Sequence, residues 1–353
     1  MSSTLKTTKN EVDMVPILGD LHIGARSGNE LYHEYFDLFF EDFFKFCDNN
    51  QVSSIIQTGD MFDVRKFVNT WCLDFFKEKF ISRIVERDIT CYVIVGNHDI
   101  HFRETLKVNT PSLVLSEWKD NFVVIDKPSE HLIDGKYSFL LVPWMAKSNR
   151  DECEDAIKMS DADYMCGHFE FNDFPMHIGS NAKSHHKHTG YRKFKTIFSG
   201  HYHTKSQKDN VVYTGTPYEL TWIDSGDKKG FFVLDENGYE FVENEHTFHE
   251  YVVYPERKDC HKKFIRAIAD NVDDKKALES WKDDLIKSGP HDIKFNEKTI
   301  VVQNEETIDV KNIKSTEVLL KEAVDDLETS LDKDKLKAMI LKCYTQVQGD
   351  QND

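Results

Sequence analysis

The chain has 353 residues, of which 39% are hydrophobic and 30% are charged, a composition typical of a globular protein with one large domain and a smaller one. No apolar run is long enough to span a membrane and no signal-peptide pattern opens the sequence, so we expect a cytoplasmic protein without a membrane partner. The formal net charge of −17 argues against a large sequence-independent nucleic-acid surface, but a local basic cleft assisted by metal ions stays compatible with it.

The cysteine pattern points to the same compartment. Seven cysteines, an odd number without a CxxC pair, favour a reducing cytoplasm over a disulfide framework. Four of them fall within apolar patterns and are expected to be core thiols: Cys47, Cys72, Cys91 and Cys166. The Ser/Thr/Lys-rich segment 2–13 is predicted to be a frayed extension, with the fold starting near Val15.

The first hundred residues alternate between short apolar strands and amphipathic helices. Strands are predicted at 15–18, 54–58 and 91–95, and helices at 33–50 and 68–85. The pattern continues with strands at 139–142, 163–166 and 197–200 and a helix at 149–159. Three later strands, at 211–213, 230–234 and 239–242, are expected to be antiparallel. The alternation predicts an α/β layered sandwich of mixed sheets flanked by helices.

The character of the chain changes after residue 246. A strand at 251–254, helices at 260–269 and 275–287 and a strand at 299–303 indicate a second, smaller α/β unit. Two amphipathic helices, at 316–327 and 333–347, follow. We therefore expect three parts: a main domain at 14–246, a small domain at 247–312 and a C-terminal helix pair at 313–353.

Five predicted strands of the main part end in aspartate, histidine or asparagine residues. In layered α/β sheets the functional groups lie at the carboxyl ends of strands, where these residues fall. Carboxylates, imidazoles and an amide together suit Mn, Fe or Zn better than Mg or Ca. A pair of such ions can promote phosphoryl displacement. The residues are Asp20, His22, Asp60, Asn97, His98, His168, His201 and His203.

Each of these short motifs has a structural alternative. Gly19-Asp20-Leu21-His22 could be a helix cap, Gly96-Asn97-His98-Asp99 a turn, and Gly167-His168 a structural glycine and histidine. The five motifs occurring in order, each after an apolar strand, argue against coincidence.

The ordered set D-x-H, G-D-x-x-D, G-N-H-D, G-H and G-H-x-H resembles the calcineurin-like metallophosphoesterases. Within them, the chain is similar to the SbcD / meiotic-recombination nuclease family, most of all to the recombination endonuclease subunits of T-even-like phages. This resemblance covers residues 15–242 and includes later motifs, Val142-Pro143-Trp144-Met145, Tyr213-Thr214-Gly215-Thr216-Pro217 and Lys229-Gly230-Phe231. Beyond residue 247 only the layout is similar: a small capping domain, then helices that dock on an SbcC-type ATPase.

The resemblance implies two divalent metal ions, manganese above all and magnesium as the alternative. One ion would be held by Asp20, His22, Asp60 and His203, and the other by Asp60, Asn97, His168 and His201.

The same resemblance implies further roles near the metal ions. It implies that His98, together with His22, takes part in catalysis, with His98 as the general acid for the leaving 3′ oxygen. Asp99 would orient His98 or a neighbouring loop, with a purely structural role as the alternative. Asp63 stands where some family members have histidine, which leaves its contribution open.

Basic residues near these loops are candidate DNA contacts, each with ordinary solvation as the alternative. The stretch 183–195 is the densest positive run, and we interpret it as a DNA-facing lid or, alternatively, a mobile loop. A homodimer is expected from the family and from the aromatic helix around 71–80. The candidate contacts are Arg26, Arg65, Lys66, Arg103, Lys107, Lys187, Arg192 and Lys193.

The leading hypothesis is therefore the nuclease subunit of an ATPase–nuclease complex for DNA recombination and repair, with exonuclease and single-strand endonuclease activity by a two-metal mechanism. A phage member would act in the host cytoplasm. A second hypothesis is a phosphodiesterase or phosphatase for small molecules or phosphoproteins. A third is a weakly active regulatory scaffold for the ATPase.

Overall fold

The computed structural model describes residues 14–172, 174–177, 180–181, 188–270 and 272–298, together with Lys333, Lys335 and Lys337. The chain divides into two units, residues 1–299 and residues 300–353. Within the described residues, no helix has both the length and the apolar character that crossing a lipid bilayer requires. The strand expected at 299–303 and most of the helix pair expected at 313–353 lie outside the described residues.

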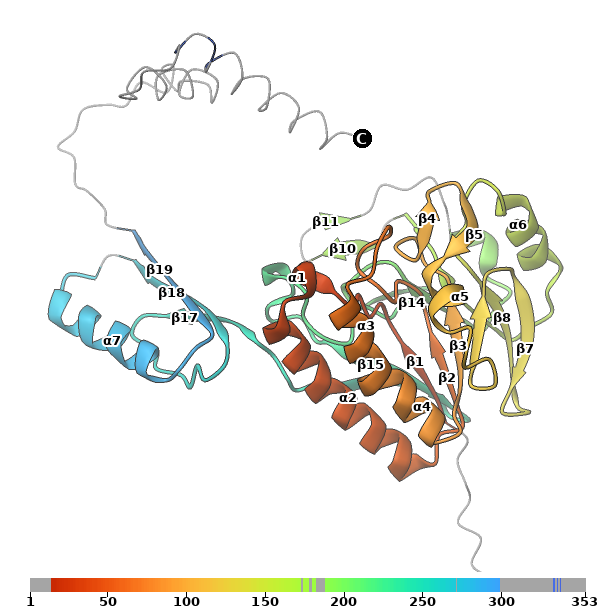
Figure 1. Ribbon diagram of the computed structural model, residues 1–353, viewed down its shortest axis with the longest axis horizontal. Coiled ribbons are helices and arrows are strands. Elements are labelled where there is room, and N and C mark those ends of the chain that lie inside the picture. Colours follow the sequence, from red (N-terminus) through yellow and green to blue (C-terminus); the bar gives the residue numbers. More distant parts are fainter. Residues whose placement is uncertain are drawn as a thin grey trace, which may run out of the picture. The chain divides into compact units, whose positions relative to one another are not determined.

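Two six-stranded mixed sheets form the centre of the first unit (Figure 1). One has the order β16 (Gly238–Glu243), β15 (Gly230–Asp235), β1 (Val15–Leu18), β2 (Ser54–Gln57), β3 (Thr90–Ile94) and β6 (Phe122–Ile125). The other has the order β13 (Ser206–Lys208), β14 (Val211–Tyr213), β12 (Thr196–Gly200), β9 (Tyr164–His168), β8 (Tyr137–Val142) and β7 (Ser129–Ile133).

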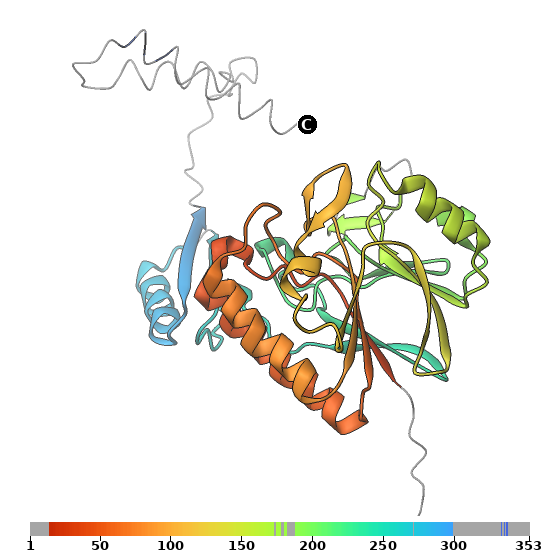
Figure 2. The ribbon, with the colours of Figure 1, turned by 45° about the vertical axis from the view of Figure 1, so that its right-hand side comes forward.

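Helices cover the outer faces of both sheets. The first sheet is covered by α2 (Glu30–Asn50) and by a continuous helical run of α3 (Thr70–Phe76), the π-helical turn η1 (Lys77–Ile81) and α4 (Ser82–Glu86). Figure 2 shows this run beside α2, where the rings of Phe40 and Phe80 lie 5.5 Å apart. The second sheet is covered by α6 (Arg150–Met159). The α/β layered sandwich is thereby confirmed.

Side-chain alternation along the strands produces this layering. In β1, Ile17 faces the other sheet and Leu18 faces α2, while in β8 Leu141 and Val142 divide between the inter-sheet core and the α6 side. Successive residues of a strand point to opposite faces, so a strand that is apolar throughout is buried on both. The four expected core thiols, those of Cys47, Cys72, Cys91 and Cys166, are all buried and free.

A smaller parallel sheet follows residue 246, with the order β17 (His249–Val253), β18 (Phe264–Asp270) and β19 (Asp292–Lys298), and α7 (Lys275–Lys287) packs on it. The expected helix at 260–269 is wrong, because this segment contains β18. Its buried residues Ile265, Ala267 and Ala269 recur with the period of two of a strand. The segment that precedes β18 contacts α2, because the Tyr35 hydroxyl donates a hydrogen bond to the Lys262 carbonyl at 2.8 Å.

One further expectation needs correction. The strand at 211–213 is β14, which pairs in parallel with β12 and antiparallel only with β13. The elements that were not expected include the hairpin of β4 (Ile100–Phe102) and β5 (Thr105–Asn109), helix α5 (Thr110–Val114), and the sheet strands β6, β7, β13 and β19. The remaining short elements are α1 (Ala25–Gly28), β10 (Pro175–His177), β11 (Ser180–Asn181), η2 (His188–Tyr191) and η3 (Trp222–Asp224).

Candidate metal centre

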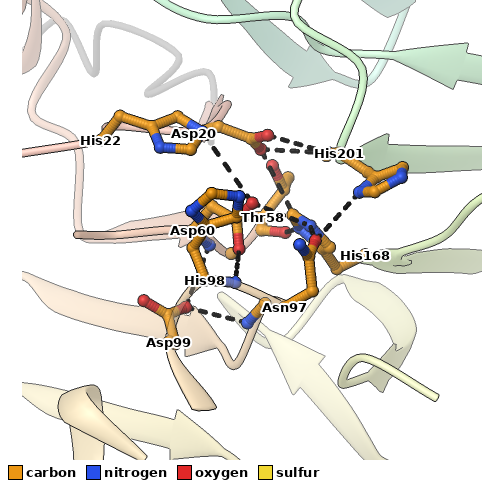
Figure 3. Close-up of polar contacts among 12 residues, drawn as sticks. Asp20, His22, Thr58, Asp60, Asn97, His98, Asp99, His168 and His201 are labelled. Carbon is orange, nitrogen blue, oxygen red and sulfur yellow. Dashed lines mark hydrogen bonds and ion pairs between the residues drawn. The ribbon is translucent and has the colours of Figure 1, made fainter. Parts of the chain in front are cut away.

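The carboxyl ends of five strands meet at one edge of the two sheets. The strands β1, β2 and β3 run parallel in one sheet, and β9 and β12 run parallel in the other, so their polar ends come together. Figure 3 shows the side chains that follow them converging on one point. Asp20, His22, Asp60 and His168 are almost fully buried there.

Three groups of side chains offer ligand atoms that lie within 4.8 Å of one another. The first contains Asp20, His22 and His203, and the second contains Asp60, His168 and His201. These are the residues that the sequence pattern predicts, although Asn97 belongs to the second group only through its contacts. Its Oδ1 atom lies 2.8 Å from His168 Nε2 and 2.9 Å from His201 Nδ1.

The third group contains His22, Asp63 and His98. Asp63 Oδ1 lies 3.2 Å from His22 Nδ1, and the Asp63 carbonyl accepts a hydrogen bond from His98 Nδ1 at 2.7 Å. Asp63 therefore contacts both histidines, a contribution that the sequence left open. The ring of Trp144 was also missed: its centroid lies 5.3 Å from that of His201 and 5.9 Å from that of His168.

The backbone at this edge is held in an unusual conformation. His22, Asp60 and His201 have positive φ angles of 43°, 53° and 92°. Residues other than glycine rarely adopt this region of backbone conformation. Glycines permit the close approach of the loops: a Cβ on Gly96 would collide with Asp60 Oδ1, and one on Gly200 would collide with Asp20 Oδ1. Buried side-chain hydrogen bonds hold these loops together.

Asp99 provides the largest set of these hydrogen bonds. Its carboxylate accepts from the backbone N–H groups of Asp60 at 2.9 Å, Met61 at 3.0 Å, Phe62 at 3.4 Å and Gly96 at 2.8 Å. It thereby ties the loop after β2 to the loop after β3. The hydrogen bonds of the Asp99 carboxylate go to this backbone and not to the His98 ring.

The donor atoms fit divalent cations. The Nε2 atom of the buried His22 makes no hydrogen bond within the described part of the chain, and its Nδ1 atom has only the contact with Asp63 Oδ1 at 3.2 Å, so Nε2 is a polar atom without a partner in the interior. The Nδ1 atom of His168 lies 2.9 Å from the Thr58 carbonyl, which can only accept. In the neutral imidazole Nδ1 then carries the hydrogen, and the Nε2 lone pair faces Asp60 Oδ2 at 3.3 Å. A cation among these nitrogen and oxygen atoms would satisfy them together.

Burial and neighbouring charges shift the pKa values in opposite directions. Burial raises the pKa of Asp20 to about 7. Burial also opposes ionisation of Asp60, but His168, His22 and His98 outweigh it and hold the Asp60 pKa well below its ordinary value. For His168, burial lowers the pKa, yet the charges of Asp60 and Asp20 raise it to about 9. Burial lowers the pKa of both His201 and His203 to about 3.

The predicted DNA contacts divide by their surroundings. Arg26 Nε donates to the Leu220 carbonyl at 3.0 Å, and Lys193 Nζ donates to the Lys158 and Ser160 carbonyls. Arg192 pairs with Asp209 at 3.8 Å. In the described part of the chain, Arg65 and Arg103 have no carboxylate within 4.0 Å, and Lys66 and Lys107 are exposed. Lys187 lies outside the described residues.

Comparison with known proteins agrees with this architecture. Residues 15–205 match the model of the calcineurin-like phosphoesterase family, and the chain belongs to that family. Members of this fold hold divalent metal ions, for which the clustered carboxylate and imidazole donors are suited. The chain is also similar to exonuclease subunit 1 of Enterobacteria phage T4, with 31% identity over 327 residues that cover 90% of this chain and 94% of the phage protein.

The pKa values predict that metal binding releases protons. At about pH 6 the metal-free protein holds a proton on both Asp20 (pKa about 7) and His168 (pKa about 9), and both must be lost before these groups bind a cation. We expect the apparent affinity for Mn²⁺ to rise with pH through this range. Calorimetric titration in buffers of different ionisation enthalpy should show more protons released at about pH 6 than at about pH 8. Equal release at both pH values would contradict these protonation states of Asp20 and His168.

Proposed function

We propose that this protein is the nuclease subunit of a DNA recombination and repair complex, hydrolysing DNA phosphodiester bonds with a pair of divalent metal ions. The observation that carries the proposal is the convergence of Asp20, Asp60, His168 and their neighbours at the strand ends. The chain has 31% identity to almost the full length of a phage exonuclease subunit, which supports a nuclease over a phosphatase or a scaffold. Manganese is the metal that the family resemblance favours, and the mixture of carboxylates and histidines suits Mn, Fe or Zn better than Mg or Ca.

Two overlapping ligand sets would hold the ions. Asp60 would belong to both sets. Its Oδ2 atom lies 3.3 Å from His168 Nε2 and 3.9 Å from His22 Nε2. When bound, the two cations supply Lewis acidity, neutralising the scissile phosphate and making the attacking water more acidic. The full sets are Asp20, His22, Asp60 and His203 for one ion, and Asp60, Asn97, His168 and His201 for the other.

His98 is placed to hold a proton beside this centre. Its backbone N–H donates to Asp60 Oδ1 at 2.7 Å, and its Nδ1 faces the Asp63 carbonyl at 2.7 Å. Because a carbonyl can only accept, Nδ1 carries a hydrogen, and Nε2 is the atom that can give a proton to a leaving oxygen. Burial lowers the pKa of His98, which makes the protonated ring a stronger acid. His98 is therefore the proposed general acid for the leaving 3′ oxygen.

Replacement of His98 tests this assignment. We expect His98→Ala to reduce cleavage of labelled duplex DNA by about a hundredfold or more, the usual contribution of a general acid. Metal content should stay at the wild-type level, because neither proposed ligand set includes His98. The matched control is His101→Ala, a nearby half-buried histidine whose ring packs on Phe102. Assays with Mn²⁺ and Mg²⁺ would be compared. Cleavage by His98→Ala within threefold of wild type would contradict the assignment.

Arg65 and Arg103 are the proposed phosphate contacts. Arg65 follows the Asp60 loop, and Arg103 lies at the turn of the β4–β5 hairpin that begins just after Asp99. Burial lowers the pKa of Arg65, and the charge of Arg103 lowers it further, while Asp60 raises it. The two guanidinium groups are thus close enough to repel each other. A DNA phosphate between them would relieve this repulsion in a chain whose net charge is −17.

The salt dependence of DNA binding measures this contact. We expect the double substitution Arg65→Gln and Arg103→Gln to weaken binding and to reduce the slope of log affinity against log salt by about 2, since each phosphate contact contributes about 0.9. The charge-matched control, Lys45→Gln with Lys119→Gln, changes two exposed lysines elsewhere on the surface. An unchanged slope in the arginine variant would count against these contacts.

The partner and the domain roles rest on family resemblance. The related phage protein is named as a subunit, which supports an assembly. We propose an SbcC-type ATPase as the partner, residues 247–312 as a capping domain and residues 313–353 as the docking segment. The six cysteines that the structure describes are free and buried, which supports a reducing location such as the cytoplasm.

We also propose a homodimer, but the aromatic helix gives it less support than its sequence suggested, because most of its aromatic side chains are not free to form an interface. Phe76 and Phe80 are buried against the protein's own core, and Trp71 is 37% exposed. Phe67, at 68%, is the most exposed aromatic residue near it. The molar mass from light scattering decides between monomer and dimer.

Deletion of the C-terminal segment tests the docking proposal. A chain that ends at Ser315 should lose binding to the ATPase subunit but keep metal-dependent hydrolysis of a small phosphodiester such as bis(p-nitrophenyl) phosphate. The reason is that every proposed metal ligand lies before residue 204. Co-purification measures the first property and absorbance the second. Retained ATPase binding by the shortened chain would refute the assignment of residues 313–353.

A further inference from the structure

The backbone carbonyl of His203 accepts two hydrogen bonds from segments that lie far along the chain. One comes from the Lys229 ammonium at 2.8 Å, and the other from the Thr216 N–H at 3.1 Å. Both donors belong to motifs, Tyr213-Thr214-Gly215-Thr216-Pro217 and Lys229-Gly230-Phe231, for which the proposed chemistry assigns no role. The two motifs therefore meet at the backbone carbonyl of His203, a histidine of the metal centre.

Lys229 is an unusual residue in this position, because its side chain is only 2% exposed. A buried ammonium is costly unless it is paired and hydrogen-bonded. Lys229 Nζ lies 2.8 Å from Asp224 Oδ1, 3.0 Å from Asp227 Oδ2 and 2.8 Å from the His203 carbonyl oxygen. An ammonium group has three N–H donors, and each has one acceptor here. The position of Nζ is therefore fixed in all directions.

The acceptors are themselves held in place. Asp224 closes the capping box of η3 and accepts from the N–H groups of Leu220 at 3.0 Å and Thr221 at 2.8 Å. The same turn is attached to β17, where the Ser225 hydroxyl donates to the His249 carbonyl at 2.9 Å. Rigid support of this kind transmits the position of Lys229 to the backbone of His203.

We propose that Lys229 is a positioning residue of the metal centre, holding the His203 backbone so that its imidazole completes the group formed by Asp20 and His22. The inference rests on the proposed metal site. The loop from Gly200 to His203 carries two proposed ligands, and His201 within it has a φ of 92°, so the loop depends on external contacts to keep its shape. Lys229 supplies such a contact through the His203 carbonyl. Asp224 and Asp227 are the two carboxylate partners of the Lys229 ammonium.

Measurement of metal affinity tests the proposal directly. We expect Lys229→Met, which keeps an unbranched side chain one atom shorter and removes the donors, to weaken the binding of one of two Mn²⁺ ions by about 10- to 100-fold, the usual effect of losing a residue that orients a ligand. Mn²⁺ binding is followed by electron paramagnetic resonance. The turnover rate at saturating Mn²⁺ should recover, and the KM for DNA should stay unchanged. A purely structural role would lower the melting temperature without changing Mn²⁺ affinity.

The neighbouring residue provides the matched control. Lys228 is exposed and pairs with Glu243 at 2.7 Å, so Lys228→Met should keep wild-type Mn²⁺ affinity. If Lys229→Met does not fold, the double variant Lys229→Met with Asp224→Asn also removes the more buried of the two partner charges, and the same weakening is expected. Affinity within twofold of wild type in a folded variant would overturn the role of Lys229. A wild-type protein that binds no Mn²⁺ would instead refute the proposed function.

Discussion

The hydrogen bonds around Asp60 are the constraint on which the centre depends. Its backbone N–H is held by Asp99, its Oδ1 atom accepts from the His98 N–H, and its Oδ2 atom faces His168. These contacts connect the ends of β2, β3 and β9, and thus both sheets. They also maintain a positive φ of 53° that an aspartate rarely adopts. A carboxylate with so many fixed contacts has little freedom to move, which suits a ligand shared between two ions.

Electrostatics explains why such an arrangement needs cations. Asp20, Asp60 and Asp99 are buried within one small volume, where burial disfavours their charged forms. In the metal-free protein, protons compensate for part of this charge, as the raised pKa values of Asp20 and His168 indicate. Divalent ions would replace these protons. The fold has brought together buried carboxylates and imidazoles that cannot all find hydrogen-bond or ion-pair partners among themselves, and this is the reason for metal binding.

The local part of this architecture could be predicted from the sequence, since it follows from short-range patterns. Apolar strands that end in glycine and a polar residue placed Asp20, Asp60, Asn97, His168 and His201 at one edge of the sheets, where the structure has them. The layered fold followed from the alternation of strands and helices. A helix was predicted at 260–269, where the structure has a strand. The apolar residues at alternate positions in this segment are too few to distinguish a strand from a short helix.

Residues that act through long-range contacts could not be predicted in the same way. Asp63 contacts His22 and His98 from the loop after β2, and Trp144 approaches His201 from the loop after β8. Lys229 contacts His203 across 26 positions of the chain. Short motifs contain Asp63, Trp144 and Lys229, but these motifs do not give the residues' roles, because the roles depend on tertiary packing. The role of Lys229 became visible only from its hydrogen-bond partners.

Anomalous diffraction from a crystal soaked in manganese tests the two-metal centre most directly. We predict two Mn²⁺ peaks about 3.5–4 Å apart, with Asp60 in contact with both and with His203 and His201 each bound to a different ion. The absence of a peak at Asp60, or a single ion held without the histidines that follow β9 and β12, would contradict a two-metal centre.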